Sequence, residues 1–213
     1  MASLDRDFFV ASFRRMAVAA EVNRDEWTRL DGQIGDGDHG INMSIGFREV
    51  VKQLDALPDD TDIAGTFKLV GMTLLRRVGG ASGPLYGSFF MKAGAEVAGQ
   101  SEVSVDDLPR MLRAGVASIQ ARGKAELGDK TMLDSYLPGL DVLEAADLSD
   151  AVAAFSSFVE RMQQGSDDTI PLQAKKGRAM RLGPRSIGHR DPGSQSAWQL
   201  MECFLEELKG IKN

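Results

Sequence analysis

Apolar residues recur at intervals of three and four along most of the chain, with charged residues between them. Phe9, Phe13 and Met16 show this spacing near the N-terminus, and Ile41 and Ile45 show it further on. Residues three and four apart share one face of an α-helix, so the pattern predicts amphipathic helices. It returns over residues 63–78, 108–119, 152–162 and 193–208.

Signals for β-strands are nearly absent. No stretch of alternating β-branched residues is bounded by tight-turn dipeptides, which is the pattern expected of a strand. We therefore predict an all-α fold of about eight helices in one bundle or barrel. A chain of 213 residues is long enough for one such domain and shows no long linker, so we predict a single domain over residues 1–213.

The charge and the hydropathy of the chain limit which partners and which cellular location we expect for it. A net charge of -6 with a pI near 5.0 argues against nucleic acid as a partner, because binding a phosphate backbone requires a basic face. No apolar run approaches the roughly 20 residues of a membrane span, and the N-terminus lacks the basic region of a signal peptide. We therefore expect a cytoplasmic protein without a membrane partner. The single cysteine, Cys203, lies in an apolar-periodic segment and is expected to be buried.

The 23 glycines are concentrated in four segments between the predicted helices. These segments are Gly32–Gly40, Gly79–Gly87, Gly123–Gly128 and Gly177–Gly193. Binding and catalytic residues are commonly carried by loops at the ends of regular elements, so these four segments are the first places to search for a functional site.

The first segment carries three carboxylates, Asp31, Asp36 and Asp38, separated by glycines that allow a tight backbone. Such close negative charges repel each other unless a cation lies between them, and oxygen ligands suit Mg²⁺ or Ca²⁺. The EF-hand pattern fails, because the twelfth position from Asp36 is Phe47 rather than a glutamate. Mg²⁺ shared with substrate phosphates fits this incomplete ligand set. The alternative is a surface turn with helix-capping aspartates.

The other segments carry features of an anion site. Gly79–Gly87 leaves backbone N–H groups open to an anion, although it lacks the Walker sequence. Arg122–Lys124 and Gly128–Asp134 form a polar loop, in which Met132 is placed to flank a purine ring. Residues 175–193 are rich in arginine, which matches phosphoryl oxygens. Each segment alone is compatible with an ordinary turn or a solvated basic face, but together they predict a magnesium–nucleotide phosphotransfer site.

The same segments resemble a known family. Leu30–Met43, Gly79–Gly87, Gly128–Leu133 and Lys175–Gly193 resemble, in the same order, the four motif blocks of the L subunits of dihydroxyacetone kinases. The resemblance covers nearly the whole chain. It implies a barrel of eight antiparallel helices that binds ADP or ATP at one end, together with two Mg²⁺ ions.

Carried over by position, the resemblance assigns roles to single residues. Asp31, Asp36 and Asp38 are expected to be the metal ligands, and Arg178 is expected to be the catalytic residue that neutralises charge on the transferred phosphoryl group. The residues expected to line the nucleotide are His39, Gly40, Ile41, Asn42, Ala81, Ser82, Gly123, Met132, Arg178, Asp191, Pro192 and Gly193.

One segment departs from the family pattern. Where the family commonly has Arg-Ala-Ser-Tyr-Leu-Gly-Glu-Arg, this chain has Arg178-Ala-Met180-Arg181-Leu-Gly-Pro184-Arg185. The departure lies beside the expected catalytic arginine and adds a positive charge. It therefore leaves open which sugar and which partner this site serves.

The resemblance further implies that the chain is one half of an enzyme. The other half is a separate K subunit, in which a histidine holds a short ketose. In some members ADP stays bound and is rephosphorylated by a phosphohistidine carrier protein, whereas others use exchangeable ATP; we expect the first arrangement. Two alternatives stay open: an ATP-dependent kinase module for another ketose such as erythrulose, and a nucleotide-sensing subunit that docks on a transcription factor.

Overall fold

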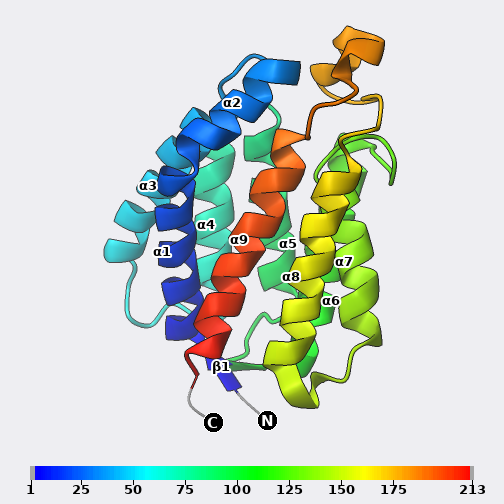
Figure 1. Cartoon of the computed structure of the whole chain (residues 1–213). Helices are drawn as coiled ribbons and strands as arrows, with labels where there is room; N and C mark the ends of the chain where they lie inside the picture. The colour runs from blue at the N-terminus through cyan, green and yellow to red at the C-terminus, as the bar shows by residue number, and fades with distance from the viewer. Residues whose placement is uncertain (1–2, 212–213) are drawn as a thin grey trace.

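The computed structural model describes residues 3–211, and most of these residues are helical (Figure 1). The α-helices within that range are α1 (Arg6–Val22), α2 (Arg24–Ile34), α3 (His39–Asp55), α4 (Ile63–Arg77), α5 (Ser82–Ala95), α6 (Leu108–Gly123), α7 (Leu133–Ala145), α8 (Ala151–Asp168) and α9 (Pro192–Lys209). The remaining elements are the strands β1 (Ser3–Asp5) and β2 (Glu102–Ser104) and the 3₁₀ segments η1 (Val105–Asp107), η2 (Leu148–Asp150) and η3 (Ala179–Ser186). The all-α prediction is confirmed, while the predicted domain, residues 1–213, extends at both ends beyond the described residues.

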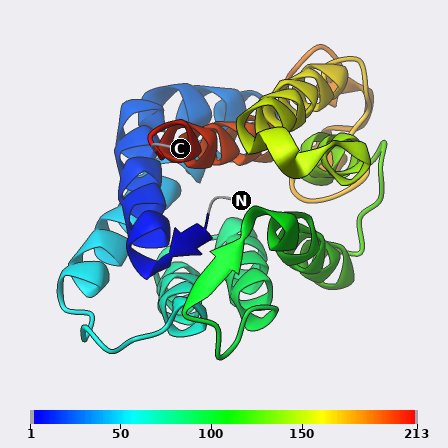
Figure 2. The same cartoon turned by 90° about the horizontal axis from the view of Figure 1, so that it is seen from below.

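Eight of these helices form a closed ring around a central core (Figure 2). Each helix packs on the next in the order α1, α3, α4, α5, α6, α7, α8 and α9, and α9 returns to α1. Neighbours run in opposite directions, because α3, α5, α7 and α9 begin at the end of the molecule where α4, α6 and α8 stop (Figure 1). α2 lies at that same end, against α3 and α9. The predicted barrel of about eight helices is therefore confirmed.

Close packing within the ring depends on glycines inside helices. A methyl group on Gly71 of α4 would lie 2.5 Å from the carbonyl oxygen of Gly87 in α5, and one on Gly87 would lie 2.7 Å from that of Gly71. Neither distance is possible for a real side chain, so only glycine permits this approach. The predicted loop Gly79–Gly87 ends at Ala81 in the structure, because α5 begins at Ser82. Its later glycines lie in that packed helix.

The two short strands pair antiparallel, which the sequence pattern did not predict. Leu4 of β1 lies opposite Val103 of β2, and both residues are fully buried. Three residues are too few to show the two-residue alternation that marks a strand, which explains the omission. The strands lie at the end of the ring away from α2, so we call this end the closed end and the opposite one the open end (Figures 1 and 2).

Aromatic side chains fill the centre of the ring. Phe67 packs edge to face with both Phe9 and Phe13 at centroid distances of 5.1 Å, and Phe13 packs in the same way on Phe90 at 5.4 Å. These contacts join α1, α4 and α5 through a geometry that aromatic pairs favour. Cys203 is buried, as predicted. No helix within residues 3–211 is long and apolar enough to cross a membrane.

Candidate functional site

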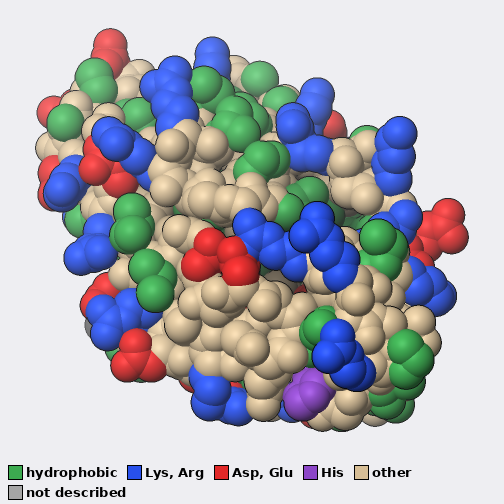
Figure 3. Space-filling model, turned by 90° about the horizontal axis from the view of Figure 1, so that it is seen from above, with side chains coloured by type: hydrophobic (Ala, Val, Ile, Leu, Met, Phe, Trp, Pro, Cys, Tyr) green, Lys and Arg blue, Asp and Glu red, His purple; other side chains and the backbone are tan. Residues whose placement is uncertain are grey.

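A cavity of about 340 Å³ lies at the open end of the barrel. Its wall comes from four stretches that are far apart in the sequence: residues 31–42, 79–85, 119–133 and 176–193. These stretches coincide with the four segments that the sequence singled out. Seen from this end, acidic side chains lie next to a row of Lys and Arg side chains (Figure 3). The fold therefore brings the candidate acidic and basic segments to one site.

Four helices begin at this cavity. The first residues of α3, α5, α7 and α9, which are His39, Ser82, Leu133 and Pro192, all line its wall. N–H groups in the first turn of a helix have no partner within the helix and carry partial positive charge. No side chain caps α5 at Ala81, so its first N–H groups are open to a bound group. This part of the cavity therefore favours an anion.

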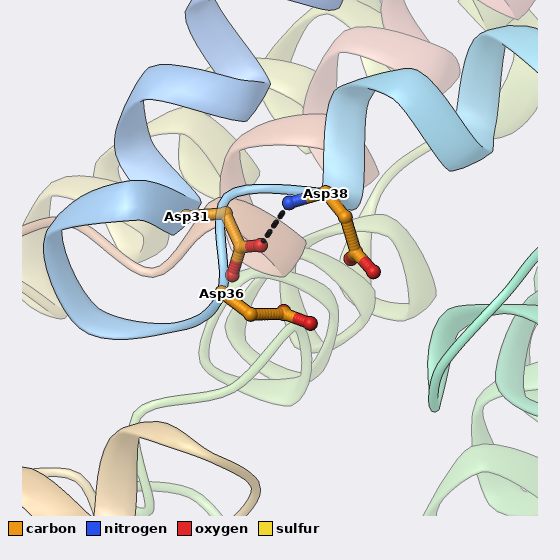
Figure 4. Close-up of side chains that lie close together, drawn as sticks. All are labelled: Asp31, Asp36 and Asp38. Carbon is orange, nitrogen blue, oxygen red and sulfur yellow. Dashed lines mark hydrogen bonds between the residues drawn. The ribbon is translucent and has the colours of Figure 1, made fainter.

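The three aspartates of the first segment converge at the edge of the cavity (Figure 4). One carboxylate oxygen from each of Asp31, Asp36 and Asp38 lies within 4.8 Å of the others. The backbone N–H groups of Asp38 and His39 donate to Oδ2 of Asp31, at 2.9 and 3.2 Å, and so hold the turn. A side chain at Gly35 would overlap Oδ1 of Asp31, so glycine lets the loop fold under this carboxylate.

Arg178 places a positive charge among these carboxylates. Its Nη1 forms an ion pair with Asp36 and lies 3.9 Å from Oδ2 of Asp38. The three side chains are each about half exposed. Converging carboxylates repel each other, and here a guanidinium group offsets that repulsion. A donor set made only of carboxylate oxygens also fits a hard divalent cation such as Mg²⁺.

His39 is a nearly buried part of the cavity wall and links three of the helices that begin there. Its Nδ1 is 3.0 Å from Oγ of Ser82, and its Nε2 is 2.9 Å from Oγ of Ser196. Ser196 is in turn 2.8 Å from the hydroxyl of Tyr86. Burial lowers the pKa of His39 to about 4, so the imidazole is neutral near pH 7 and bridges two hydroxyl groups. The network fixes the N-termini of α3, α5 and α9 relative to one another.

Two other carboxyl groups shape the wall by accepting hydrogen bonds from the backbone. Asp134 accepts from the N–H groups of Gly128 and Thr131, at 2.6 and 2.7 Å, and so folds the turn before α7. Asp191 caps α9 by accepting from the N–H of Ser194 at 2.6 Å. Burial raises the pKa of Asp191 to about 7 and also raises the pKa of Asp134. Both groups are engaged with backbone N–H donors, and neither belongs to the converging cluster.

The segment between α8 and α9 closes one side of the cavity, and we call residues 170–190 the Arg178 loop. Its two ends lie together, because the N–H of Gly188 donates to the carbonyl oxygen of Ile170 at 2.8 Å. Just outside the loop, the N–H of Asp191 donates to Oγ1 of Thr169 at 3.0 Å. The loop contains η3, which packs on α2 (Figure 1, orange). It carries Arg178 to the aspartates.

Most residues predicted to hold the nucleotide or the metal lie in the cavity wall. These residues are Asp31, Asp36, Asp38, His39, Asn42, Ala81, Ser82, Gly123, Met132, Arg178, Asp191, Pro192 and Gly193. Gly40 and Ile41 are not among them. Gly40 is buried where α3 crosses α2, and a side chain there would overlap the carbonyl oxygen of Arg24. Ile41 is 45% exposed on the outer face of α3. The structure thus gives Gly40 a packing role.

The wall also contains residues that sequence reasoning missed as site residues. Leu85 and Ile119 form an apolar part of it, and Lys130 lies in the turn before α7. Helical spacing assigns Ile119 to the core, where it lies, and the pattern cannot show that the same residue also lines a cavity at a helix end. Lys130 is only 2% exposed. A lysine in a polar segment carries no signal of burial, since lysines are usually exposed.

Comparison with known proteins identifies close relatives. A model of the DAK2 domain matches residues 33–206. The chain is 58% identical over 208 residues to the ADP-binding subunit DhaL of PEP-dependent dihydroxyacetone kinase 2 from Listeria innocua, over 97% of this chain and 96% of that protein. It is 43% identical over 212 residues to the ADP-binding subunit DhaL of the PEP-dependent dihydroxyacetone kinase from Escherichia coli, over 97% and 99% of the two chains.

A solved structure shows the same fold. The dihydroxyacetone kinase of C. freundii, in complex with AMP-PNP and Mg²⁺, matches with a TM-score of 0.73 at 24% sequence identity. The match covers 97% of this chain and 35% of that one. The resemblance found in the four sequence segments is confirmed by the family match and by the relatives. The chain belongs to the DAK2 domain family, together with the ADP-binding subunits of dihydroxyacetone kinases.

Proposed function

We propose that this chain is the nucleotide-binding subunit of a dihydroxyacetone kinase. It holds ADP or ATP with two Mg²⁺ ions and passes the phosphoryl group to a short ketose bound on a separate K subunit. The observation that carries the proposal is the shared cavity, in which three converging carboxylates face the N-termini of four helices. The name of the 58%-identical relative, an ADP-binding subunit, supports the identity of the nucleotide.

The two sides of the cavity have opposite electrostatic preferences. The helix N-termini attract an anion, whereas Asp31, Asp36 and Asp38 repel one. A chain of phosphates fits between them only if a cation screens the carboxylates. Mg²⁺ held by the three aspartates would supply that screening and withdraw charge from the phosphoryl oxygens. Nucleotide binding by this chain therefore requires the metal.

The rest of the wall matches the parts of a nucleotide. Leu85, Ile119 and Met132 provide an apolar surface suited to the faces of an adenine ring. The open N–H groups at Ser82 lie at the N-terminus of α5, where phosphate oxygens accept hydrogen bonds. Arg178 lies on the aspartate side, where its guanidinium group neutralises charge on the phosphoryl group in transfer. Electrostatic positioning of this kind requires no covalent intermediate on the chain.

The ketose is assigned to a second protein. About two thirds of the C. freundii kinase has no counterpart in this chain, which covers 35% of it. We infer that a K subunit supplies the ketose site and delivers the acceptor hydroxyl to the open cavity. The relatives are named PEP-dependent, which supports a cycle in which ADP stays bound and is rephosphorylated by a phosphohistidine carrier protein.

Reconstitution tests the proposal. The purified chain is dialysed and assayed for retained ADP, then mixed with a K subunit, dihydroxyacetone and either ATP or a phosphohistidine carrier with its phosphoenolpyruvate-fed enzymes. We expect ADP to be retained and dihydroxyacetone phosphate to form with the carrier. Rapid exchange of bound nucleotide with free ATP would instead indicate an ATP-dependent ketose kinase module. Nucleotide binding without transfer to any K subunit would indicate a regulatory subunit.

A further inference from the structure

Lys130 is a buried cation whose hydrogen-bond partners are backbone groups. Its ammonium donates to the carbonyl oxygen of Thr169 at 2.7 Å and to that of His189. Burial lowers the pKa of Lys130, while the charges of Asp191 and Asp134 oppose that shift. Lysine is rarely buried to this degree, because removing its charge from water is costly unless the site compensates. Two carbonyl groups supply its hydrogen bonds here, and the nearby carboxyl groups of Asp191 and Asp134 favour its charge.

Those two carbonyl groups lie at the two ends of the Arg178 loop. Thr169 follows α8 and immediately precedes the loop, and His189 is the last residue but one of the loop. Lys130 reaches both from the connection between α6 and α7, so one ammonium group joins three separate stretches of chain. The neighbouring residue also holds the loop: the carbonyl oxygen of Asp129 accepts from the N–H of Lys175 at 3.1 Å.

The backbone at Lys130 has a conformation that is unusual for a lysine. Its φ is +63°, a left-handed conformation that is unfavourable for residues other than glycine. Glycine would relieve this cost but would remove the ammonium group. Lys124, at the end of α6, has a similar φ of +48°, yet its side chain is exposed. The two lysines thus share a backbone conformation and differ in burial, which makes them a matched pair.

We propose that Lys130 is a positioning residue, whose ammonium group fastens both ends of the Arg178 loop to the turn before α7. Fastened in this way, the loop holds Arg178 at the aspartates and slows the escape of nucleotide from the cavity. The fastening of the loop is independent of the proposed function. The effect on nucleotide escape rests on that function.

Limited proteolysis tests the fastening without any nucleotide. Lys130→Met keeps most of the side-chain length and removes the charge, and Lys124→Met makes the same change at the exposed lysine. Trypsin is expected to cut the loop of Lys130→Met about tenfold faster than that of the wild type or of Lys124→Met, since hydrogen bonds from a charged group are lost. Mass spectrometry would follow the tryptic sites Lys175, Lys176, Arg178, Arg181 and Arg185. Should Lys130→Met fail to fold, Lys130→Gln, which retains a shorter neutral donor, takes its place.

Nucleotide kinetics test the consequence. A fluorescent ADP analogue bound with Mg²⁺ and chased with excess ADP is expected to leave Lys130→Met about tenfold faster than it leaves the wild type. The rate for Lys124→Met should be unchanged, because Lys124 is not among the residues that line the cavity. In the assay with a K subunit, kcat should fall more than KM for dihydroxyacetone changes, because Arg178 is displaced while the ketose site lies on the other protein. A loss of stability alone would lower the melting temperature without lowering kcat more than it changes KM.

Equal cleavage of the loop in Lys130→Met and Lys124→Met would overturn the proposal. Faster cleavage combined with an unchanged rate of ADP release would also contradict it, because the loop would then not retain nucleotide. If the wild type binds no ADP in the presence of Mg²⁺, the proposed function fails, and the cleavage comparison still decides whether Lys130 fastens the loop.

Discussion

The two ends of the barrel carry similar acidic residues and use them differently. At the closed end, Asp5 caps α1 by accepting from the N–H of Phe8 at 2.9 Å, and Asp62 caps α4 by accepting from the N–H of Gly65 at 2.7 Å. At the open end, Asp38 precedes α3 in the equivalent position, yet its side chain makes no capping hydrogen bond. Asp38 is therefore left available to a ligand, unlike Asp5 and Asp62 and unlike Asp191, which caps α9 at the open end.

The difference shows what separates a metal candidate from an acidic surface. At the closed end Asp5, Asp59 and Asp62 line one depression, but the carboxyl oxygens found there do not converge. Within residues 3–211, the group whose oxygens converge is Asp31, Asp36 and Asp38. Converging carboxylates repel each other, so they are the ones that gain most from a cation. Acidic composition alone does not distinguish these two places.

The largest expected effect is the loss of ADP affinity when an aspartate of the converging cluster is replaced. Asp36→Ala or Asp38→Ala should weaken Mg²⁺-dependent ADP binding about a hundredfold or more, because a ligand to the metal is lost. The matched control is Asp60→Ala at the closed end, which should bind ADP as the wild type does. Isothermal titration calorimetry measures the ADP affinity of these variants and of the control. An Asp36→Ala variant with wild-type affinity would show that the two ends do not differ in the way proposed.

Arg178 should affect transfer more than binding. Arg178→Ala is expected to lower kcat about a thousandfold in the reconstituted assay, while ADP affinity changes much less, since the guanidinium group acts mainly on the transferred phosphoryl group. Arg185→Ala removes a charge from the same loop without touching the cavity, and should have a much smaller effect. Equal losses in the two variants would mean that the total charge of the loop, and not the position of Arg178, supports transfer.

Burial of Asp191, the capping aspartate of α9, should make the stability of the chain depend on pH. The pKa of Asp191 is raised to about 7 by burial, so between about pH 4 and pH 7 the folded chain holds a proton that the unfolded chain has lost. Stability of the wild type should therefore fall as pH rises through that range. Asp191→Asn keeps a capping acceptor and does not titrate, so it should be more stable than the wild type at pH 8, by ~2 kcal/mol, and close to it at pH 4. Thermal unfolding of the nucleotide-free protein, with Asp62→Asn as the control, checks this; the same difference at both pH values would contradict it.

The smallest expected effect concerns the closed end alone. Asp62→Ala removes the cap of α4 and should lower the free energy of unfolding by about 1 kcal/mol, because the N–H of Gly65 loses its acceptor. ADP affinity should not change. Urea unfolding and titration with ADP measure the two quantities on one preparation. A loss of ADP affinity in this variant would show that the closed end influences the open one.

Much of the fold was predictable from the spacing of apolar residues. The last helix was expected over residues 193–208 and spans Pro192–Lys209. The spacing of apolar residues does not predict the strands β1 and β2, because segments of three residues are too short to show that they pair with residues 97 to 101 positions away. The sequence predicts a loop that extends to Gly87, because it does not reveal that Gly87 lies against Gly71 across a helix interface.

The site was predictable where chemistry is carried by local sequence. Converging aspartates such as Asp36 and Asp38 stand out because glycines and charges alternate over a few residues. A residue whose role depends on distant parts of the chain gives no local signal in the sequence. Lys130 is such a residue, because its ammonium group donates to the carbonyl oxygens of Thr169 and His189, about forty and sixty positions away. The resemblance assigns Gly40 to the nucleotide, and that role stays a prediction; in the structure Gly40 lies at the packed crossing of two helices.

The most direct test of the central claim is the metal dependence of ADP binding by the wild-type chain. Protein freed of nucleotide is titrated with ADP by calorimetry, once with Mg²⁺ and once with EDTA. Because the cavity pairs Asp31, Asp36 and Asp38 with an anion site, we expect saturable binding with Mg²⁺ and affinity lower by about a hundredfold or more without it. Equal affinity under the two conditions would contradict the proposed role of the aspartates.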